Sequence, residues 1–292
     1  EPYSRFTEVG MMNHPNDFIV IKSKPSGNLS QLAKLLCDRK FGIGADGLLL
    51  LDKCKNADLS MRIFNADGSE AEMCGNGARC AAYVIASNSM VSLRGVPPPA
   101  GRRSNLKKRN CFAPAGLAMT IKTKAGVINA KVCGNLVKIQ LTTPKDIKLD
   151  IPLKVNNRQI KVNFINTGVP HAVVFVNGID GINVNYIGRN IRYHKKFAPK
   201  GANVNFVEVK GPNTIRIRTY ERGVEDETLA CGTGSTAAAL IFALKNNLDD
   251  LIKVKTQSGE ILKIYFQKDN GEFRKVWLEG SARIVYKGEY YV

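Results

Sequence analysis

Two cysteines stand in nearly the same local sequence, far apart in the chain. Cys74 is followed by Gly75-Asn76-Gly77, and Cys231 is followed by Gly232-Thr233-Gly234. A small-residue apolar run comes next in both places, and aligning the two cysteines without a gap also pairs several later alanines. The repeated Cys-Gly-x-Gly motif, each time before a predicted helix, indicates two related half-sites.

Each motif places a thiol beside an anion-binding loop. A helix N-terminus presents unpaired N–H groups and the positive end of the helix dipole, so a thiol there ionises more readily than a free one. Glycine has no Cβ, so a ligand can approach the backbone closely. A carboxylate held by both helix ends would have a sulfur on each side of its α-carbon. The pattern favours inversion at that carbon, with one thiolate removing a proton and the other thiol returning one.

Two other interpretations of the cysteines compete with this one. A buried cysteine is most often a small hydrophobic residue, and Cys80, inside the first predicted helix, is assigned to packing. A redox disulfide between Cys74 and Cys231 is the stronger competitor, although the chain has no Cys-x-x-Cys pair of the kind typical of redox sites. The other four cysteines have no site context: Cys37, Cys54, Cys111 and Cys133.

The elements that must position these motifs are mostly strands. Ser30 is predicted to cap a helix that ends at Gly42, and further helices are predicted from Asn76 to Ile85 and from the second motif to Leu244. Polar turns at 65–69 and 221–223 precede the two motifs. Strands are predicted at residues 18–22, 48–51, 61–64, 119–123, 127–132, 137–141, 160–165, 172–176, 203–209, 214–220, 252–256, 261–266, 275–278 and 282–286.

This pattern predicts an α+β fold of two pseudo-symmetric β-rich lobes, each wrapped around a central Cys-headed helix. The length of 292 residues also favours two domains. We expect an N-terminal lobe over 1–143 and a C-terminal lobe over 144–280. The terminal strand, about 281–292, is expected to return to the first lobe, and the active site to lie in the cleft between the lobes.

Composition narrows the class of protein. No window approaches the roughly eighteen uninterrupted apolar residues of a membrane span, and no signal peptide opens the chain. An odd number of seven cysteines is untypical of a disulfide scaffold. We therefore expect a soluble protein of a reducing compartment, the cytoplasm. The plastid stroma is the alternative, because the sequence starts at Glu1 rather than at Met.

The distribution of charge weighs against a nucleic-acid partner, and the histidine content weighs against a metal site. The net charge of +18 is spread over strand-like segments, without an aromatic-interleaved RNA motif or zinc-finger spacing, so nucleic acid is not favoured. Histidine occurs at positions 14, 171 and 194 alone, so no metal site is predicted. Residues 87–118 combine Pro97-Pro98-Pro99 with a dense basic cluster, and are predicted to form an exposed, mobile loop to which we assign no function.

The two motifs and their surroundings resemble the signatures of the diaminopimelate epimerase family. This pyridoxal-independent enzyme interconverts LL- and meso-diaminopimelate on the route to lysine and peptidoglycan. The first likeness runs from Phe64-Asn65-Ala66-Asp67-Gly68-Ser69-Glu70 to Cys80, and the second from Tyr220-Glu221-Arg222-Gly223 to Gly234. The resemblance covers essentially the whole chain except residues 87–118. Further matches follow in family order: Asn16-Asp17-Phe18, Gly42-Ile43-Gly44-Ala45-Asp46-Gly47, Pro170-His171 and Asn203.

The resemblance implies a role for each site residue. Cys74 and Cys231 are then the acid/base pair, with no cofactor and no metal, and His171 is a helper near the site. The substrate is diaminopimelate, and a homodimer is the macromolecular partner considered. The reacting carboxylate is held by the backbone of Gly75, Asn76, Gly232 and Thr233. The amino groups and the distal carboxylate are recognised by Asn16, Asn65, Asn203, Glu221 and Arg222, residue types that suit ammonium and carboxylate groups.

Some positions depart from the family pattern. Val169 stands where many members have Asn, and Asn13-His14-Pro15-Asn16 replaces a turn that is often glycine-containing. The segment at 87–118 is longer than the usual connection.

Two alternative functions remain at this point. A proline or hydroxyproline racemase on the same two-lobed scaffold is disfavoured by Glu221-Arg222, because such substrates have no distal amino acid end. An anion-binding or nucleic-acid-binding protein without turnover is disfavoured by the thiols at both helix heads. The simplest alternative for Glu221 and Arg222 themselves is a surface ion pair.

Overall fold

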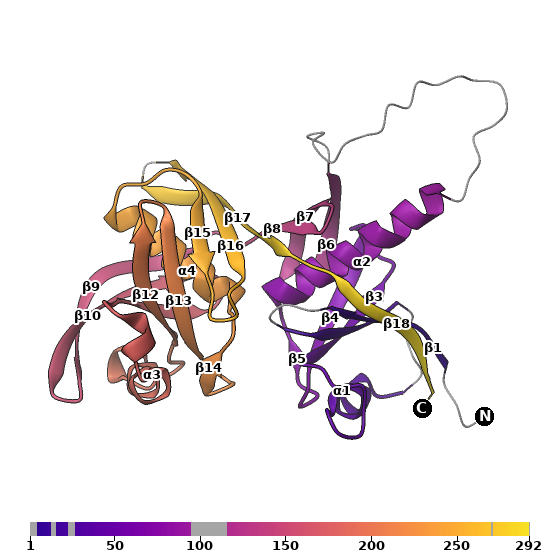
Figure 1. Cartoon of the computed structure of the whole chain (residues 1–292), viewed down its shortest axis with the longest axis horizontal. Helices are drawn as coiled ribbons and strands as arrows, with labels where there is room; N and C mark the ends of the chain where they lie inside the picture. Colours follow the sequence, from indigo (N-terminus) through magenta and orange to yellow (C-terminus); the bar gives the residue numbers. More distant parts are fainter. Residues whose placement is uncertain (1–4, 13–15, 23–26, 95–115, 270, 292) are drawn as a thin grey trace, which may run out of the picture. The chain divides into compact units, whose positions relative to one another are not determined.

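A computed structural model describes residues 5–12, 16–22, 27–94, 116–269 and 271–291. The chain separates into two compact units, one formed by residues 1–139 with 281–292 and the other by residues 140–280. In Figure 1 the first unit runs from indigo to magenta and also takes up the last, yellow strand.

The first unit combines strands with two helices. Its elements are β1 (Arg5–Met12), β2 (Phe18–Ile21), α1 (Leu29–Cys37), β3 (Gly47–Asp52), β4 (Leu59–Asn65), β5 (Glu70–Ala71), α2 (Gly75–Arg94), β6 (Leu117–Thr123), β7 (Gly126–Cys133), β8 (Leu136–Gln140) and β18 (Ile284–Tyr291).

The second unit is built from the same kinds of element. They are β9 (Lys145–Val155), β10 (Arg158–Asn166), β11 (Pro170–Phe175), the 3-10 turn η1 (Ile179–Gly181), α3 (Val184–Arg192), η2 (Lys195–Phe197), β12 (Asn203–Gly211), β13 (Thr214–Glu221), β14 (Asp226–Thr228), α4 (Gly232–Lys245), β15 (Ile252–Lys255), β16 (Ile261–Asp269) and β17 (Glu272–Ser281).

Strand pairing follows the same scheme in both units. In the first, β2 pairs parallel with β3 across the α1 crossover, β3 and β5 pair antiparallel with β4, and β4 pairs parallel with β6 across α2. In the second, β11 pairs parallel with β12 across α3, β12 and β14 pair antiparallel with β13, and β13 pairs parallel with β15 across α4. The predicted pseudo-symmetric α+β fold is confirmed.

The helix α4 lies at the centre of the second unit. Every residue from 234 to 243 is buried, and residues 237–243 are all alanine, leucine, isoleucine or phenylalanine, so this part of the helix has no polar face. The helix packs against β10 to β13 and against β15 and β16 (Figure 1). The first turns of α2, residues 75–82, are buried in the same way in the first unit. Both central helices begin directly after a motif cysteine.

The structure corrects expectations about the ends of two helices. The helix α2 continues to Arg94 rather than to Ile85, since neither proline nor glycine follows before Gly95. Part of the segment predicted as a mobile loop is therefore helical, and residues 117–118 belong to β6; residues 95–115 lie outside the described residues. The helix α1 is capped by Asn28, whose side chain accepts from the backbone of Ser30 and Gln31, rather than by Ser30 itself, and it ends at Cys37 rather than at Gly42.

The sequence pattern misses β1, β9 and α3, and it also misses the short strands β5 and β14. The strand β9 is mostly exposed, with lysines and aspartates interrupting its alternation, and β1 lies in a region without a clear period. The helix α3 is capped by Asn183 and buries Val184, Gly188 and Ile191 on one face. Those three positions at helical spacing were the available signal for α3. Within the described ranges, no helix is both long enough and apolar enough to cross a membrane.

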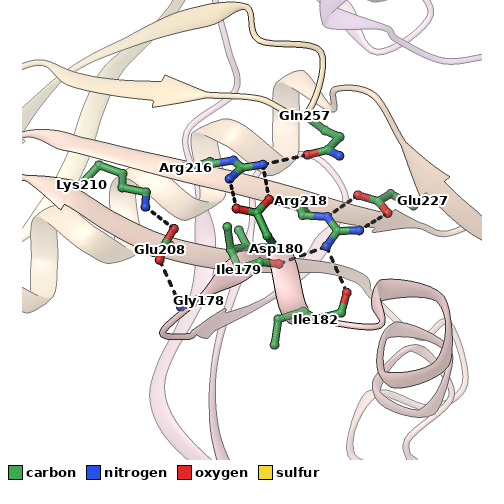
Figure 2. A network of polar contacts seen from close by, with 10 residues as sticks. All are labelled: Gly178, Ile179, Asp180, Ile182, Glu208, Lys210, Arg216, Arg218, Glu227 and Gln257. Atoms are coloured by element: carbon green, nitrogen blue, oxygen red, sulfur yellow. Dashed lines mark hydrogen bonds and ion pairs between the residues drawn. The ribbon is translucent and has the colours of Figure 1, made fainter.

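A polar network fastens residues 178–182 to the sheet of the second unit (Figure 2). Arg218 binds Glu227 through two contacts of 2.7 and 2.6 Å, and also donates to the carbonyls of Ile179 and Ile182 at 3.0 Å each. Arg216 forms a second fork with Asp180, with both contacts at 2.7 Å. The network fixes β14, the strand that leads into Cys231, against η1.

We expect the two arginines of this network to differ in their contribution to stability. The Arg218 and Glu227 side chains are 13% and 21% exposed, whereas Asp180, the partner of Arg216, is 78% exposed. Arg218→Met should lower the free energy of unfolding by about 2–4 kcal/mol, because it leaves a carboxylate and two carbonyls without their donor. Arg216→Met should cost less than about 1 kcal/mol, as for exposed pairs. Urea denaturation of both variants measures the difference, and equal losses would contradict it.

Candidate active site

The first half-site is the start of α2. The sulfur of Cys74 accepts a hydrogen bond from the N–H of Gly77 at 3.4 Å, and its carbonyl accepts from Ala78 at 2.9 Å. The thiol thus caps its own helix. The N–H groups of Gly75 and Asn76, which belong to the first helical turn, have no acceptor among the described residues. They remain available to an anion at the helix end.

The second half-site repeats this arrangement at the start of α4. Cys231 accepts from the N–H of Gly234 at 3.4 Å through its sulfur and from Ser235 at 2.8 Å through its carbonyl. The N–H groups of Gly232 and Thr233 are left without an acceptor in the part of the second unit that the structure describes. The Thr233 hydroxyl lies 3.4 Å from the sulfur. The same two backbone donors are therefore available beside each thiol.

A threonine fixes this second helix end from outside the motif. Thr167 is buried, and its hydroxyl donates to the carbonyl of Thr233 at 3.1 Å. Its own N–H donates to the carbonyl of Val169 at 3.2 Å, which shapes the turn before β11. Val169, the departure from the family pattern, thus contributes its backbone to the support of α4. Its side chain is half-buried.

A chain of polar contacts supports the first half-site. Asn76 donates to the amide oxygen of Asn16 at 2.5 Å, and Asn16 donates to Asp46 at 2.9 Å. Arg39 binds both Asp46 and Asp17, with contacts of 2.7 to 3.0 Å. Burial opposes ionisation of Asp17, but the hydrogen bonds from Arg39 and from the Asp46 backbone, together with the charge of Arg39, outweigh it and hold the pKa of this carboxyl below its usual range. The structure thus brings two predicted site residues, Asn16 and Asn76, into direct contact.

Arg79 completes this chain from inside the unit. Its side chain is 1% exposed, and it donates to the amide oxygen of Asn76 at 2.7 Å and to the carbonyl of Ser281 at 3.3 Å. The guanidinium therefore fixes which end of the Asn76 amide faces Asn16. Sequence reasoning assigned no role to Arg79. The available signal was a single arginine in an otherwise small and apolar helix segment.

Asn65 is the last residue of β4, directly before the turn that leads to β5. Its side-chain amide donates to the Ser69 hydroxyl at 2.9 Å, and its backbone N–H donates to the Ser69 carbonyl at 2.8 Å. Gly68 has a φ of +81°, and a Cβ there would lie 2.6 Å from the carbonyl of Ser30. The hydroxyl of Ser30 donates to the Gly68 carbonyl at 2.6 Å. Ser30 therefore docks the Asn65 turn onto α1.

Asn203, Glu221 and Arg222 meet at one end of the sheet in the second unit. The amide oxygen of Asn203 accepts from the backbone N–H of Arg222 at 2.7 Å, and its nitrogen donates to the carbonyl of Pro170 at 3.3 Å. Burial raises the pKa of the Glu221 carboxyl above its ordinary value. Among the described residues neither Glu221 nor Arg222 forms an ion pair, with each other or with a third residue. The simple surface ion pair is therefore not observed.

His171, the predicted helper, is completely buried on β11. Burial, helped by the positive charge of Arg222, lowers the pKa of this imidazole to about 3. The ring is neutral at physiological pH. Across the described residues, no group of three or more His, Cys, Asp or Glu side chains is arranged to hold a metal ion.

Sequence comparison finds the same family over most of the chain. The model of the family described as diaminopimelate epimerase matches residues 9–109 and 163–285. The diaminopimelate epimerase of Aquifex aeolicus is 40% identical over 288 residues, which cover 94% of this chain and 93% of that protein. That of Methanocella arvoryzae is also 40% identical, over 98% of this chain and 96% of that protein.

Solved structures of low sequence identity share the fold. A phenazine biosynthesis protein of the PhzF family from Bacillus anthracis matches with a TM-score of 0.70 at 16% identity, over 100% of this chain and 99% of that chain. A hydroxyproline epimerase from Agrobacterium vitis matches with a TM-score of 0.64 at 15% identity, over 100% and 92%. At these identities the likeness concerns the fold alone.

We expect the second glycine of the two motifs to tolerate alanine differently. A Cβ at Gly234 would lie 2.4 Å from the amide oxygen of Asn205, whereas a Cβ at Gly77 would lie 3.1 Å from a Leu49 methyl group. Gly234→Ala should cost about 1–3 kcal/mol through overpacking. Gly77→Ala should be close to neutral, because a gain in helix propensity of up to about 1 kcal/mol offsets the small adjustment of Leu49. Chemical denaturation of the two variants checks this; a loss at Gly77 as large as that at Gly234 would contradict it.

Proposed function

The chain belongs to the diaminopimelate epimerase family, and we propose that it transfers the α-proton of diaminopimelate between two thiols, those of Cys74 and Cys231. The family activity is an isomerisation, the interconversion of the LL and meso forms in lysine biosynthesis. The observation that supports the two-thiol mechanism most directly is the matched pair of helix ends. Each has a sulfur hydrogen-bonded to the third helical N–H and two further N–H groups left for a ligand.

The proposed reaction begins with one cysteine as thiolate and the other as thiol. The thiolate removes the α-proton, and the electron pair of the broken C–H bond remains on the substrate as a carbanion. The carboxylate takes up part of that charge and is stabilised by the backbone N–H groups of Gly75, Asn76, Gly232 and Thr233. The thiol then delivers its proton to the opposite face. One proton has left and one has arrived, so two acid/base groups suffice and the scheme calls for no cofactor.

The distal end of the substrate would be recognised by polar groups around both half-sites. In the second unit, Arg222 offers a planar fork for a carboxylate and Glu221 an acceptor for an ammonium group. Asn203 holds the turn that carries both. In the first unit, Asn16 stands two residues before β2 and Asn65 at the end of β4, the positions equivalent to Val169 and Glu221 in the strand scheme. A substrate with an amino acid group at each end fits these residues.

The proposed function also bears on where the protein is located in the cell and on whether it forms a homodimer. We propose a cytoplasmic location for this chain, with the plastid stroma as the alternative. A homodimer stays a prediction, which analytical ultracentrifugation would decide.

Removal of either thiol should stop epimerisation. We expect Cys74→Ala and Cys231→Ala each to reduce turnover by about a thousandfold or more, because each lacks one of the two proton-transfer groups. The measurement is interconversion of LL- and meso-diaminopimelate in deuterated water, followed by mass spectrometry and NMR of the α-position.

Cys37 provides the control for this experiment. It is buried in the core of the first unit, where burial raises the pKa of its thiol to about 12. Cys37→Ala should lose some stability and keep its turnover per folded molecule. Normal epimerisation by either motif variant would contradict the two-thiol mechanism.

Arg222 should govern affinity for the distal carboxylate. Hydrogen bonds to a charged group contribute about 1.5–3 kcal/mol, so Arg222→Met should raise KM roughly tenfold or more, with Arg222→Lys in between. Arg189→Met, an exposed position on α3, is the control and should leave KM unchanged. The unmodified protein should turn over diaminopimelate and not proline. Turnover of proline instead would favour the racemase alternative, whose members share this fold.

A further inference from the structure

Three polar side chains are buried side by side beneath the second half-site. His171 and Asn205 are 0% exposed and Thr219 is 2% exposed. They come from the adjacent strands β11, β12 and β13, and Asn205 stands directly opposite Thr219 in the antiparallel pair. Neither Asn205 nor Thr219 is among the site residues predicted from the sequence. Buried polar groups of this kind are kept where their hydrogen bonds have a defined use.

The amide of Asn205 can adopt one orientation only. Its nitrogen lies 3.3 Å from the carbonyl oxygen of Ala172, which can accept and cannot donate. The amide nitrogen therefore faces Ala172, and the amide oxygen faces the opposite way. There it accepts from the Thr219 hydroxyl at 3.0 Å. The Ala172 carbonyl sets this orientation, and the Thr219 hydroxyl, which can donate or accept, is compatible with it.

This orientation determines where His171 carries its proton. The nitrogen of Asn205 also lies 3.1 Å from Nδ1 of His171, and its second hydrogen points to that atom. Because an amide NH₂ group only donates, Nδ1 must accept, and the proton of the neutral ring is on Nε2. Among the described residues, Nε2 is buried without a hydrogen-bond partner. A buried N–H without an acceptor destabilises a fold, so its retention points to an acceptor supplied by a ligand.

Asn205 also reaches the catalytic helix. Its amide oxygen occupies the space that a Cβ on Gly234 would need, at 2.4 Å. The N–H of Gly234 is the group that donates to the sulfur of Cys231. One side chain thus contacts both His171 and the first turn of α4. Any change in the Asn205 amide would affect the two together.

We propose that Asn205 is a positioning residue that locks His171 as the neutral Nε2–H tautomer, so that the ring presents a fixed hydrogen-bond donor to the bound substrate. The proposal rests on the proposed function for the identity of the ligand, and on the strand geometry alone for the tautomer. The positive charge of Arg222 acts on the same ring, so the donor belongs to the neighbourhood assigned to the distal carboxylate. Thr219 serves as the group that supports the amide oxygen.

The tautomer can be observed directly. The chain has three histidines, at 14, 171 and 194, so long-range proton–nitrogen NMR of protein labelled with ¹⁵N-histidine gives few signals, and His171→Gln assigns the one of interest. We expect the unmodified protein to show the Nε2–H pattern for His171 near neutral pH. An Nδ1–H pattern would overturn the proposal. This reading needs no enzymatic activity, so it remains valid even if the proposed function fails.

The variant Asn205→Asp tests whether Asn205 determines the tautomer of His171. The aspartate has the same shape but offers only acceptors, so it should move the ring proton to Nδ1 or make the ring doubly protonated. We expect kcat to fall roughly tenfold to a hundredfold, the range seen when the partner of an oriented imidazole is removed, with a smaller change in KM. Retention of the Nε2–H pattern in a folded Asn205→Asp protein would overturn the proposal.

Two further variants distinguish a change in the His171 tautomer from a general loss of protein stability. Asn163 is also buried and also donates to a strand carbonyl, that of Val173, without contacting His171. Asn163→Asp should therefore destabilise the protein and leave the His171 signal unchanged. Thr219→Val should keep the Nε2–H tautomer, because the Ala172 carbonyl still orients the amide. A tautomer change in either variant would show that general loosening, rather than Asn205, controls the ring.

Discussion

The first turn of an α-helix has backbone N–H groups that the helix itself cannot satisfy, and both units of this protein are arranged around that constraint. In each central helix a cysteine sulfur satisfies the third N–H and leaves the first two for a ligand. Other features of both units keep that first turn in place. The motif glycines allow close packing beneath it, and the small apolar residues behind it let the helix pass through the middle of its unit. The sheet brings polar side chains to the helix end from neighbouring strands.

The two units share a strand scheme but support their helix ends by different physics. In the first, the support is ionic and reaches the surface: Arg39, two aspartates and Asn16 lead to Asn76, and a buried arginine holds the other side. In the second, it is neutral and fully buried, with imidazole, amide and hydroxyl groups on three adjacent strands. Charged networks in contact with water are sensitive to salt, whereas buried neutral ones are not. A duplicated fold has thus acquired two unlike environments for two chemically similar thiols.

The sequence was informative where a residue's role is local. The cysteine motifs, the polar turns before them and most strands follow from residue type and spacing, because glycine, capping and alternation act within a few residues. It was less informative where a role depends on tertiary contacts. Arg79 and Asn205 look like ordinary members of a helix and a strand, and their contacts with Asn76, Ser281 and His171 involve partners 3 to 202 positions away. The strand β9 and the helix α3 were missed because neighbouring elements stabilise them more than their own pattern does.

The length of α2 has a consequence for how this chain can vary. The helix has 20 residues, so at about 1.5 Å per residue its last turn lies roughly 30 Å along the axis from the thiol at its head. A rigid rod of that length separates the point where the long basic connection joins the fold from the chemistry at the other end. The connection can therefore change in length and composition between relatives at little cost to the reaction.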